Sequence, residues 1–200
     1  SSGKSGHNHS TNSSYLFIMP PPAVKSVRQI IYYQYAKIIA SSSGFGKAHY
    51  GMIMSKWKDL CAGTIHWSSS VREWVREREH PGECIYCGGN KDLTTEHILP
   101  RACGGEDITD NVVRVCKPCN SSKGGKRLYE WKGLKEKDNH HRIAEGKYLK
   151  YLYSLHEKRG TLDVTNVREL CPHCNMRSCC ERDGTVEKLS VYCIEGGFHK

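Results

Sequence analysis

Two pairs of cysteines are the clearest chemical signal in this sequence. Each pair has the spacing Cys-x-x-Cys, which lets two thiolates from one tight turn reach the same metal ion. The pairs are separated by 28 residues, and together they supply the four sulfur ligands of a tetrahedral structural Zn2+. The predicted ligands are Cys84, Cys87, Cys116 and Cys119. Such a zinc would hold together a segment too short to fold on a core of its own, and it would perform no catalysis.

A second group of polar residues lies between and just after these pairs: Glu96, His97, Asn111, Asn120 and Lys123. Carboxylate and amide oxygens are ligands for a hard divalent cation such as Mg2+ or Mn2+. A histidine beside them that is free of the metal is well placed to deprotonate a water molecule. These residue types therefore indicate a site that combines one divalent cation with a general base.

The order of these features resembles the HNH endonuclease family. The pattern "EHILP...GG...DNVVRVCKPCNSSKGG", together with the first cysteine pair, covers residues 84 to about 127. It is similar to the version of the family in which two Cys-x-x-Cys pairs clamp the ββα-metal motif. The resemblance implies an α+β core, in which a two-stranded hairpin and a helix hold one divalent cation, and a metal-dependent hydrolysis of DNA phosphodiester bonds.

Carried over to this sequence, the resemblance implies that Glu96 and Asn120 bind the catalytic cation and that His97 is the general base. Asn111, in the loop between strand and helix, would help to fix the loop and the orientation of His97. Lys123, one turn after Asn120, would face phosphate. The family more commonly has Asp or His at the position of Glu96, so we expect an altered geometry at this ligand.

Double-stranded DNA is the substrate, and the partner, that the resemblance implies, and we favour a restriction-type (type II-like) enzyme that cuts specific sequences. A homing or mobile-element nuclease and a non-specific HNH nuclease are the alternatives within the family. A homodimer suits a restriction role, because a two-strand cut needs two active sites or two successive nicks. The alternative outside the enzymes is a zinc-ribbon module that binds nucleic acid without cutting it.

The C-terminal tail has a third Cys-x-x-Cys pair and further cysteines that could hold a second structural Zn2+. The preferred ligands are Cys171, Cys174, Cys180 and Cys193. Cys179 is the substitute for Cys180, and the tail also contains His173 and His199. The predicted zinc content is therefore two ions per chain.

Composition and local signals divide the chain into five parts. These are a polar tail or expression remnant at 1–14, a helical region at 15–80, the HNH core at 81–131, a basic helix at 132–160 and the zinc-binding module at 161–200. The N-terminal helices are expected to pack around a small core rather than to carry chemistry.

Capping signals place three helices around the core. The first is capped near Ser26 and ends at a Ser/Gly run over 41–46, and the second has the capping-box spacing of Ser70 and Glu73. The third is a basic, tyrosine-rich helix closed by Gly160. Its tyrosines are assigned to the core rather than to base stacking.

The net charge of +9 is unevenly distributed. Residues 112–160 contain thirteen Lys and Arg against five Asp and Glu, whereas residues 81–111 contain two against six. A basic segment next to an acidic one suits a phosphate-binding surface beside a cation site. The sequence shows no secretory signal and no apolar run of about 20 residues. Several of its eleven cysteines form Cys-x-x-Cys pairs, which favours reduced thiolates that bind metal over disulfides. We expect an intracellular, cytoplasmic protein of prokaryotic origin, not associated with a membrane.

Overall fold

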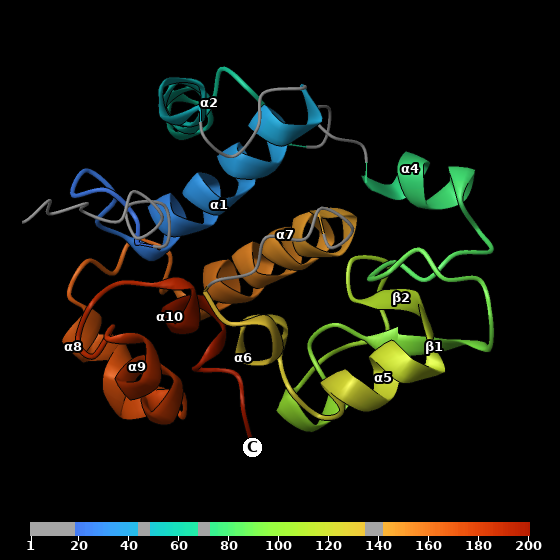
Figure 1. Ribbon diagram of the computed structural model, residues 1–200. Helices are drawn as coiled ribbons and strands as arrows, with labels where there is room; N and C mark the ends of the chain where they lie inside the picture. The colour runs from blue at the N-terminus through green and yellow to red at the C-terminus, as the bar shows by residue number, and fades with distance from the viewer. Residues whose placement is uncertain (1–18, 44–48, 68–72, 135–141) are drawn as a thin grey trace, which may run out of the picture.

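The computed structural model describes four stretches of the chain: residues 19–43, 49–67, 73–134 and 142–200 (Figure 1). The predictions for residues 1–14 and for the cap at Ser70 lie outside these stretches. Within them, the structure consists of helices and one small antiparallel sheet, which confirms the predicted α+β class. None of the described helices is long and apolar enough to cross a membrane.

Helix α1 (Val27–Ser42) forms as its cap predicts. The Ser26 hydroxyl accepts a hydrogen bond from the backbone N–H of Gln29, and the Gln29 side chain accepts one from the backbone N–H of Ser26. Side chains around most of α1 are buried, because α2 (Tyr50–Ala62) and α7 (Arg142–Arg159) pack against it. Helix α2 was not predicted. It begins without a side-chain cap, so its sequence has no capping signal at this end.

Helix α7 runs through the middle of the molecule, between α1 and the sheet (Figure 1). It ends at Gly160, whose φ of 68° is the left-handed conformation expected of a closing glycine. Tyr148 and Tyr151 are buried, which confirms that these tyrosines belong to the core.

Helix α4 (Glu73–Glu79) docks on α7 through two ion pairs. The Glu73 carboxylate lies 2.6 Å from the Lys150 ammonium, and the Glu77 carboxylate lies 2.7 Å from the Lys147 ammonium. Glu73 and Lys147 are buried, so these pairs are shielded from salt better than surface pairs. Two lysines of the basic segment therefore join helices instead of facing solvent.

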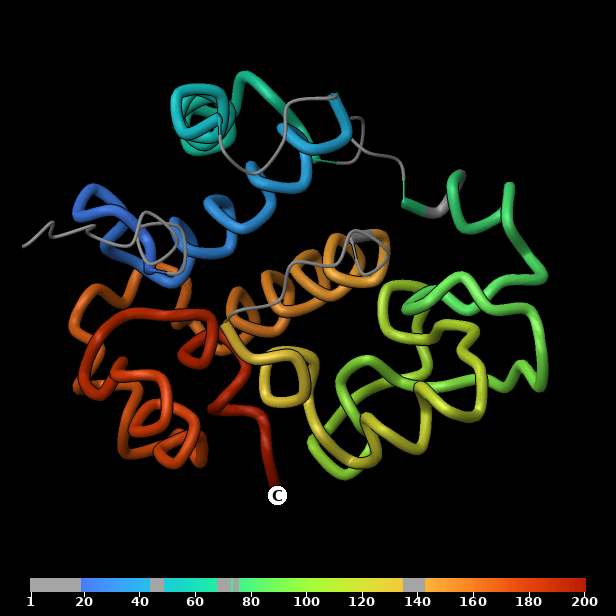
Figure 2. Tube along the Cα trace, in the orientation of Figure 1, coloured from blue at the N-terminus to red at the C-terminus, as the bar shows by residue number. Residues whose placement is uncertain are grey.

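The sheet is a hairpin of β1 (Leu93–His97) and β2 (Val112–Cys116), paired so that the first residue of β1 faces the last of β2. Helix α5 (Lys117–Lys123) follows β2 without a gap and packs on the hairpin (Figures 1 and 2). A short 3-10 helix, η2 (Arg101–Cys103), lies in the connection between the strands. This strand–strand–helix order is the ββα arrangement that the resemblance implies.

The C-terminal third adds short helices, of which α10 (Val191–Glu195) packs against α1 and α6 (Leu128–Lys132). The Glu195 carboxylate is fully buried and accepts hydrogen bonds from the backbone N–H groups of Tyr129 and Glu130 and from the Tyr148 hydroxyl. Burial raises the pKa of Glu195 to about 7. The tail is therefore fastened to the core by side chains other than cysteine. The elements are α6 (Leu128–Lys132), α8 (Val167–Leu170), η3 (Cys171–His173), α9 (Arg177–Asp183) and α10 (Val191–Glu195).

Candidate metal centre and active site

The four cysteines of the first two pairs come together at one end of the hairpin. Their sulfur atoms all lie within 4.8 Å of one another, and the Sγ atoms of Cys87 and Cys116 are 3.6 Å apart. Two sulfurs on one tetrahedral zinc, each about 2.3 Å from the ion, would be separated by about 3.8 Å. The cluster therefore fits a structural Zn2+, held by Cys84, Cys87, Cys116 and Cys119.

The local backbone explains why these pairs can share an ion. Gly88 adopts a φ of 74°, and its N–H donates to the Cys84 carbonyl oxygen at 2.8 Å, which closes the first turn. The N–H of Gly89 donates to the Cys87 sulfur at 3.4 Å. In the second pair, Cys116 is both the last residue of β2 and the N-cap of α5. An ion here would fix a turn, a strand and a helix to one another.

The tail cysteines are neighbours, but they are not arranged in the same way. Burial, and then the charges of Cys174 and Cys180, raise the pKa of Cys193 to about 12. Over the described residues, the first cluster is the one group that brings three or more ligand atoms within 4.8 Å. The second zinc therefore stays a prediction.

Strand β1 sends neighbouring side chains to opposite faces of the hairpin. The Glu96 side chain, 7% exposed, lies on the face covered by α5. Thr95 is exposed on the other face, and the ring of His97, 17% exposed, lines a pocket with it. Glu96 and His97 are adjacent in sequence, yet their functional atoms are separated by the sheet.

Lys123 has a different partner from the one predicted. Its ammonium group forms an ion pair with the Glu96 carboxylate and donates a hydrogen bond of 3.1 Å to the backbone carbonyl oxygen of His97. The side chain is fully buried, and burial lowers its pKa against the raising effect of Glu96. The prediction that Lys123 faces phosphate is therefore wrong. Its charge neutralises Glu96 between the hairpin and α5.

The Glu96–Lys123 ion pair affects whether Glu96 and Asn120 can bind the predicted divalent cation. The Glu96 carboxylate is closed off from solvent and already has a cationic partner, and Asn120 is half-buried in α5. A divalent cation bound by both would have to displace the Lys123 ammonium. In this arrangement the two side chains do not fit an open cation site beside the His97 ring, and their ligand roles stay predictions.

Replacing Lys123 with methionine should destabilise the protein by about 3–5 kcal/mol, because it leaves the Glu96 carboxylate buried without its partner. Urea unfolding of the zinc-loaded protein would measure the loss. The double variant Glu96→Gln/Lys123→Met should recover most of it. The matched control is Lys126→Met at an exposed lysine three residues later, expected to change stability by less than about 0.5 kcal/mol. Equal unfolding midpoints for the two single lysine variants would contradict the structural role.

Asn111 and the paired glycines Gly104 and Gly105 together fix the conformation of the loop between the strands. The buried Asn111 side chain accepts a hydrogen bond from the Leu99 N–H at 2.7 Å and donates to the carbonyl oxygens of Leu99 and Glu106, each at 3.0 Å. A Cβ on Gly105 would lie 1.8 Å from the Leu99 carbonyl oxygen, and Gly104 has a φ of 88°. Asn111 thus fixes the loop from its position just before β2, not from between a strand and a helix.

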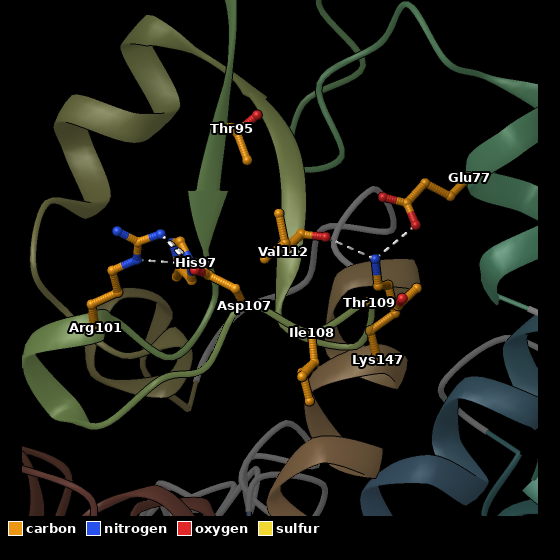
Figure 3. A pocket seen from close by; sticks show the side chains of 9 residues that line it. All are labelled: Glu77, Thr95, His97, Arg101, Asp107, Ile108, Thr109, Val112 and Lys147. Atoms are coloured by element: carbon orange, nitrogen blue, oxygen red, sulfur yellow. Dashed lines mark hydrogen bonds and ion pairs between the residues drawn. The ribbon is translucent and has the colours of Figure 1, made fainter.

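His97 lines an open pocket of about 500 Å³ on the hairpin face away from α5 (Figure 3). Arg101 and Asp107 contact the His97 ring and line one side of the pocket. Lys147, which is ion-paired with Glu77, lines the opposite side of the pocket. Hydrogen bonds from Arg101 and then from His97 hold the pKa of Asp107 below its usual range. His97 is the one predicted catalytic residue among the described residues that line this pocket.

Sequence reasoning missed Arg101, Asp107 and Lys147. The alternation of side chains along β1 was a usable signal, because successive residues of a strand point to opposite faces and Glu96 and His97 must therefore face different neighbours. It indicates that the partners of the His97 ring come from the loop that follows β1. No comparable signal was available for Lys147, which reaches the pocket from α7.

The basic segment also presents less charge to solvent than its composition suggests. Lys123, Arg127 and Lys147 are all buried and each is ion-paired with a glutamate. A count of charges along the sequence therefore overestimates the phosphate-binding surface. Exposed basic side chains include Arg114 on the hairpin, Lys117 at the start of α5 and Lys126 just after it.

The hairpin, the helix and the cysteine cluster define the class of this core. Residues 84–128 match the family model described as HNH endonuclease, so this stretch, which contains the four-cysteine cluster, is similar to an HNH endonuclease core. A curated relative, the type IV methyl-directed restriction enzyme EcoKMcrA of Escherichia coli (strain K12), is 34% identical over 73 residues. That match covers 30% of this chain and 26% of the relative, so the chain spans about a quarter of the relative's length. No solved structure matches the chain significantly.

Proposed function

We propose that this protein is a DNA endonuclease in which His97 is the general base. The observation that supports the proposal is the placement of His97 at the end of a cysteine-clamped hairpin, with its ring in an open pocket, inside the stretch that matches the HNH model. A water molecule hydrogen-bonded to the neutral imidazole would lose a proton to it as the water oxygen attacks phosphorus. The 3′ oxygen would then leave with the bonding electron pair.

The neighbouring residues supply what this reaction needs from the protein. The Arg101 guanidinium, 68% exposed beside the ring, can donate hydrogen bonds to a phosphate oxygen. The buried bonds of Asn111 keep the loop that carries Arg101 in place. The proposal includes the requirement for one Mg2+ or Mn2+ ion that the HNH resemblance implies, whose chemistry is to stabilise negative charge at the phosphate.

The proposed substrate is double-stranded DNA, cut in a restriction-type reaction by a homodimer. The relative is named a methyl-directed restriction enzyme. Methylated DNA is therefore the form to compare with unmethylated DNA of the same sequence.

The test is incubation of the zinc-loaded protein with methylated and unmethylated plasmid in Mg2+ or Mn2+, with and without EDTA. Discrete fragments that disappear with EDTA are the expected result. A smear would favour a non-specific HNH nuclease, and cutting confined to methylated plasmid would favour the methyl-directed class over the type II-like one. Plasmid that stays intact with every divalent ion, but is shifted in a binding gel, would favour the zinc-ribbon module without catalysis.

Binding should weaken steeply with salt if the exposed basic residues contact phosphates. Neutralising three phosphates, by Arg114, Lys117 and Lys126, would lower affinity about 40-fold as salt rises roughly fourfold. Fluorescence anisotropy with a labelled duplex and the His97→Ala variant would measure this without cleavage. An affinity that does not change with salt would show that these basic residues do not contact the DNA phosphates.

A further inference from the structure

The ring of His97 is held by a carboxylate that plays no part in the mechanism above. The Nε2 atom of His97 contacts Oδ1 of Asp107 closely. One terminal nitrogen of Arg101 donates to both carboxylate oxygens of Asp107, at 2.8 Å each, and the Arg101 Nε lies 3.3 Å from the same ring nitrogen (Figure 3). Arg101 and Asp107 thus form a clamp on one edge of the imidazole.

The contacts determine which ring nitrogen carries the proton. Nε2 cannot donate to a carboxylate and accept from a guanidinium at the same time. The contact with Asp107 is the shorter of the two, and the guanidinium has the carboxylate as a better acceptor, so Nε2 carries the hydrogen and donates it. In the neutral imidazole the lone pair is then on Nδ1.

We infer that Asp107 is a positioning residue that fixes the Nε2–H tautomer of His97 and leaves Nδ1 as the atom that accepts the proton of the attacking water. This inference rests on the proposed function. The proton moves from the water oxygen to Nδ1, and the imidazolium that forms carries one positive charge next to the Asp107 carboxylate.

The loop that carries Asp107 is anchored well enough to position it. Its neighbour Glu106 donates a backbone hydrogen bond of 3.0 Å to the Tyr151 hydroxyl, and the Glu106 carbonyl oxygen accepts one of 3.0 Å from Asn111. Gly105, on the other side of Glu106, is packed against the Leu99 carbonyl oxygen. Asp107 itself is 65% exposed, so its side chain contributes little to stability.

A second aspartate offers a matched control. Asp163 also receives two hydrogen bonds from one arginine, Arg28, at 2.9 and 3.1 Å, and is 79% exposed. It does not line the His97 pocket. Asp163→Asn therefore removes the same kind of surface ion pair as Asp107→Asn, but outside the pocket that His97 lines.

The experiment compares wild type, Asp107→Asn, Asp107→Glu, Asp163→Asn and His97→Ala in steady-state cleavage of a duplex substrate. We expect Asp107→Asn to lower kcat about 10–100-fold with KM within about twofold, Asp107→Glu to recover part of the loss, and Asp163→Asn to match wild type. If His97→Ala is inactive and Asp107→Asn keeps the wild-type kcat, the role of Asp107 is overturned and the proposed function stands. If His97→Ala cuts at the wild-type rate, the proposed function fails.

A measurement without substrate tests the tautomer directly. In 15N–1H spectra of the imidazole groups, with His97 assigned by its absence in His97→Ala, wild type and Asp163→Asn should show the Nε2–H form. Asp107→Asn should show a mixture of tautomers, because its amide can donate as well as accept. A wild-type ring in the Nδ1–H form would overturn the inference whatever the cleavage rates.

Discussion

Replacing His97 with alanine should lower the rate of DNA cleavage by about 10²–10⁴-fold, the usual contribution of a general base. The fold should survive the change. The ring lies at the edge of the sheet, and its hydrogen-bond partners, Asp107 and Arg101, are exposed side chains. The backbone carbonyl of residue 97 still accepts the Lys123 hydrogen bond in the variant, because that bond does not involve the side chain. We expect a change in unfolding free energy below about 0.5 kcal/mol and an unchanged zinc content.

The measurement is single-turnover cleavage with enzyme in excess, which separates chemistry from DNA binding. His80→Ala is the matched control, since His80 is also an exposed histidine next to a carboxylate, Glu83, but lies outside the pocket. It should cut at the wild-type rate. A His97→Ala protein that cuts as fast as His80→Ala would remove His97 from the mechanism.

The parts of this core that could be predicted depend on short-range chemistry. Cysteine spacing was sufficient to identify the four-cysteine cluster, because each Cys-x-x-Cys turn is complete within a few residues. The capping box at Ser26 located α1 for the same reason. Asn111 was predicted as the residue that fixes the loop, and its side chain does bond the loop backbone at Leu99 and Glu106.

The parts that could not be predicted depend on which side chains meet across elements. A lysine one turn after Asn120 could have pointed at phosphate, and only the packing of α5 on the hairpin shows that Lys123 meets Glu96 instead. The same holds for Lys147, whose partner Glu77 lies 70 residues away in the chain. Asp107 was not predicted, because its contact with His97 depends on how the loop between the strands folds back past the ring.

Replacing Cys116 with serine should show which part of the protein depends on zinc for its folding. Serine is a good helix N-cap, so the variant keeps the cap of α5 and removes one metal ligand. Structural zinc is worth about 10–16 kcal/mol in small domains, which is comparable with the whole stability of a typical protein. The segment 84–123 has little core of its own, so we expect the hairpin and α5 to lose their structure. Cleavage should then be undetectable.

The helices α1, α2, α7 and α10 pack against one another through contacts that do not involve the cysteine cluster, so they should persist. Far-UV circular dichroism should therefore keep most of its helical signal, while limited proteolysis should cut within 84–123 and zinc analysis should show one ion fewer than wild type. Cys61→Ser, at an exposed cysteine of α2, is the control and should match wild type in all three measurements. The wild-type value also tests the tail, because two zinc ions per chain would support the predicted second site and one would exclude it. A Cys116→Ser protein with wild-type zinc content and a protected hairpin would show that the four-cysteine cluster does not hold this core together.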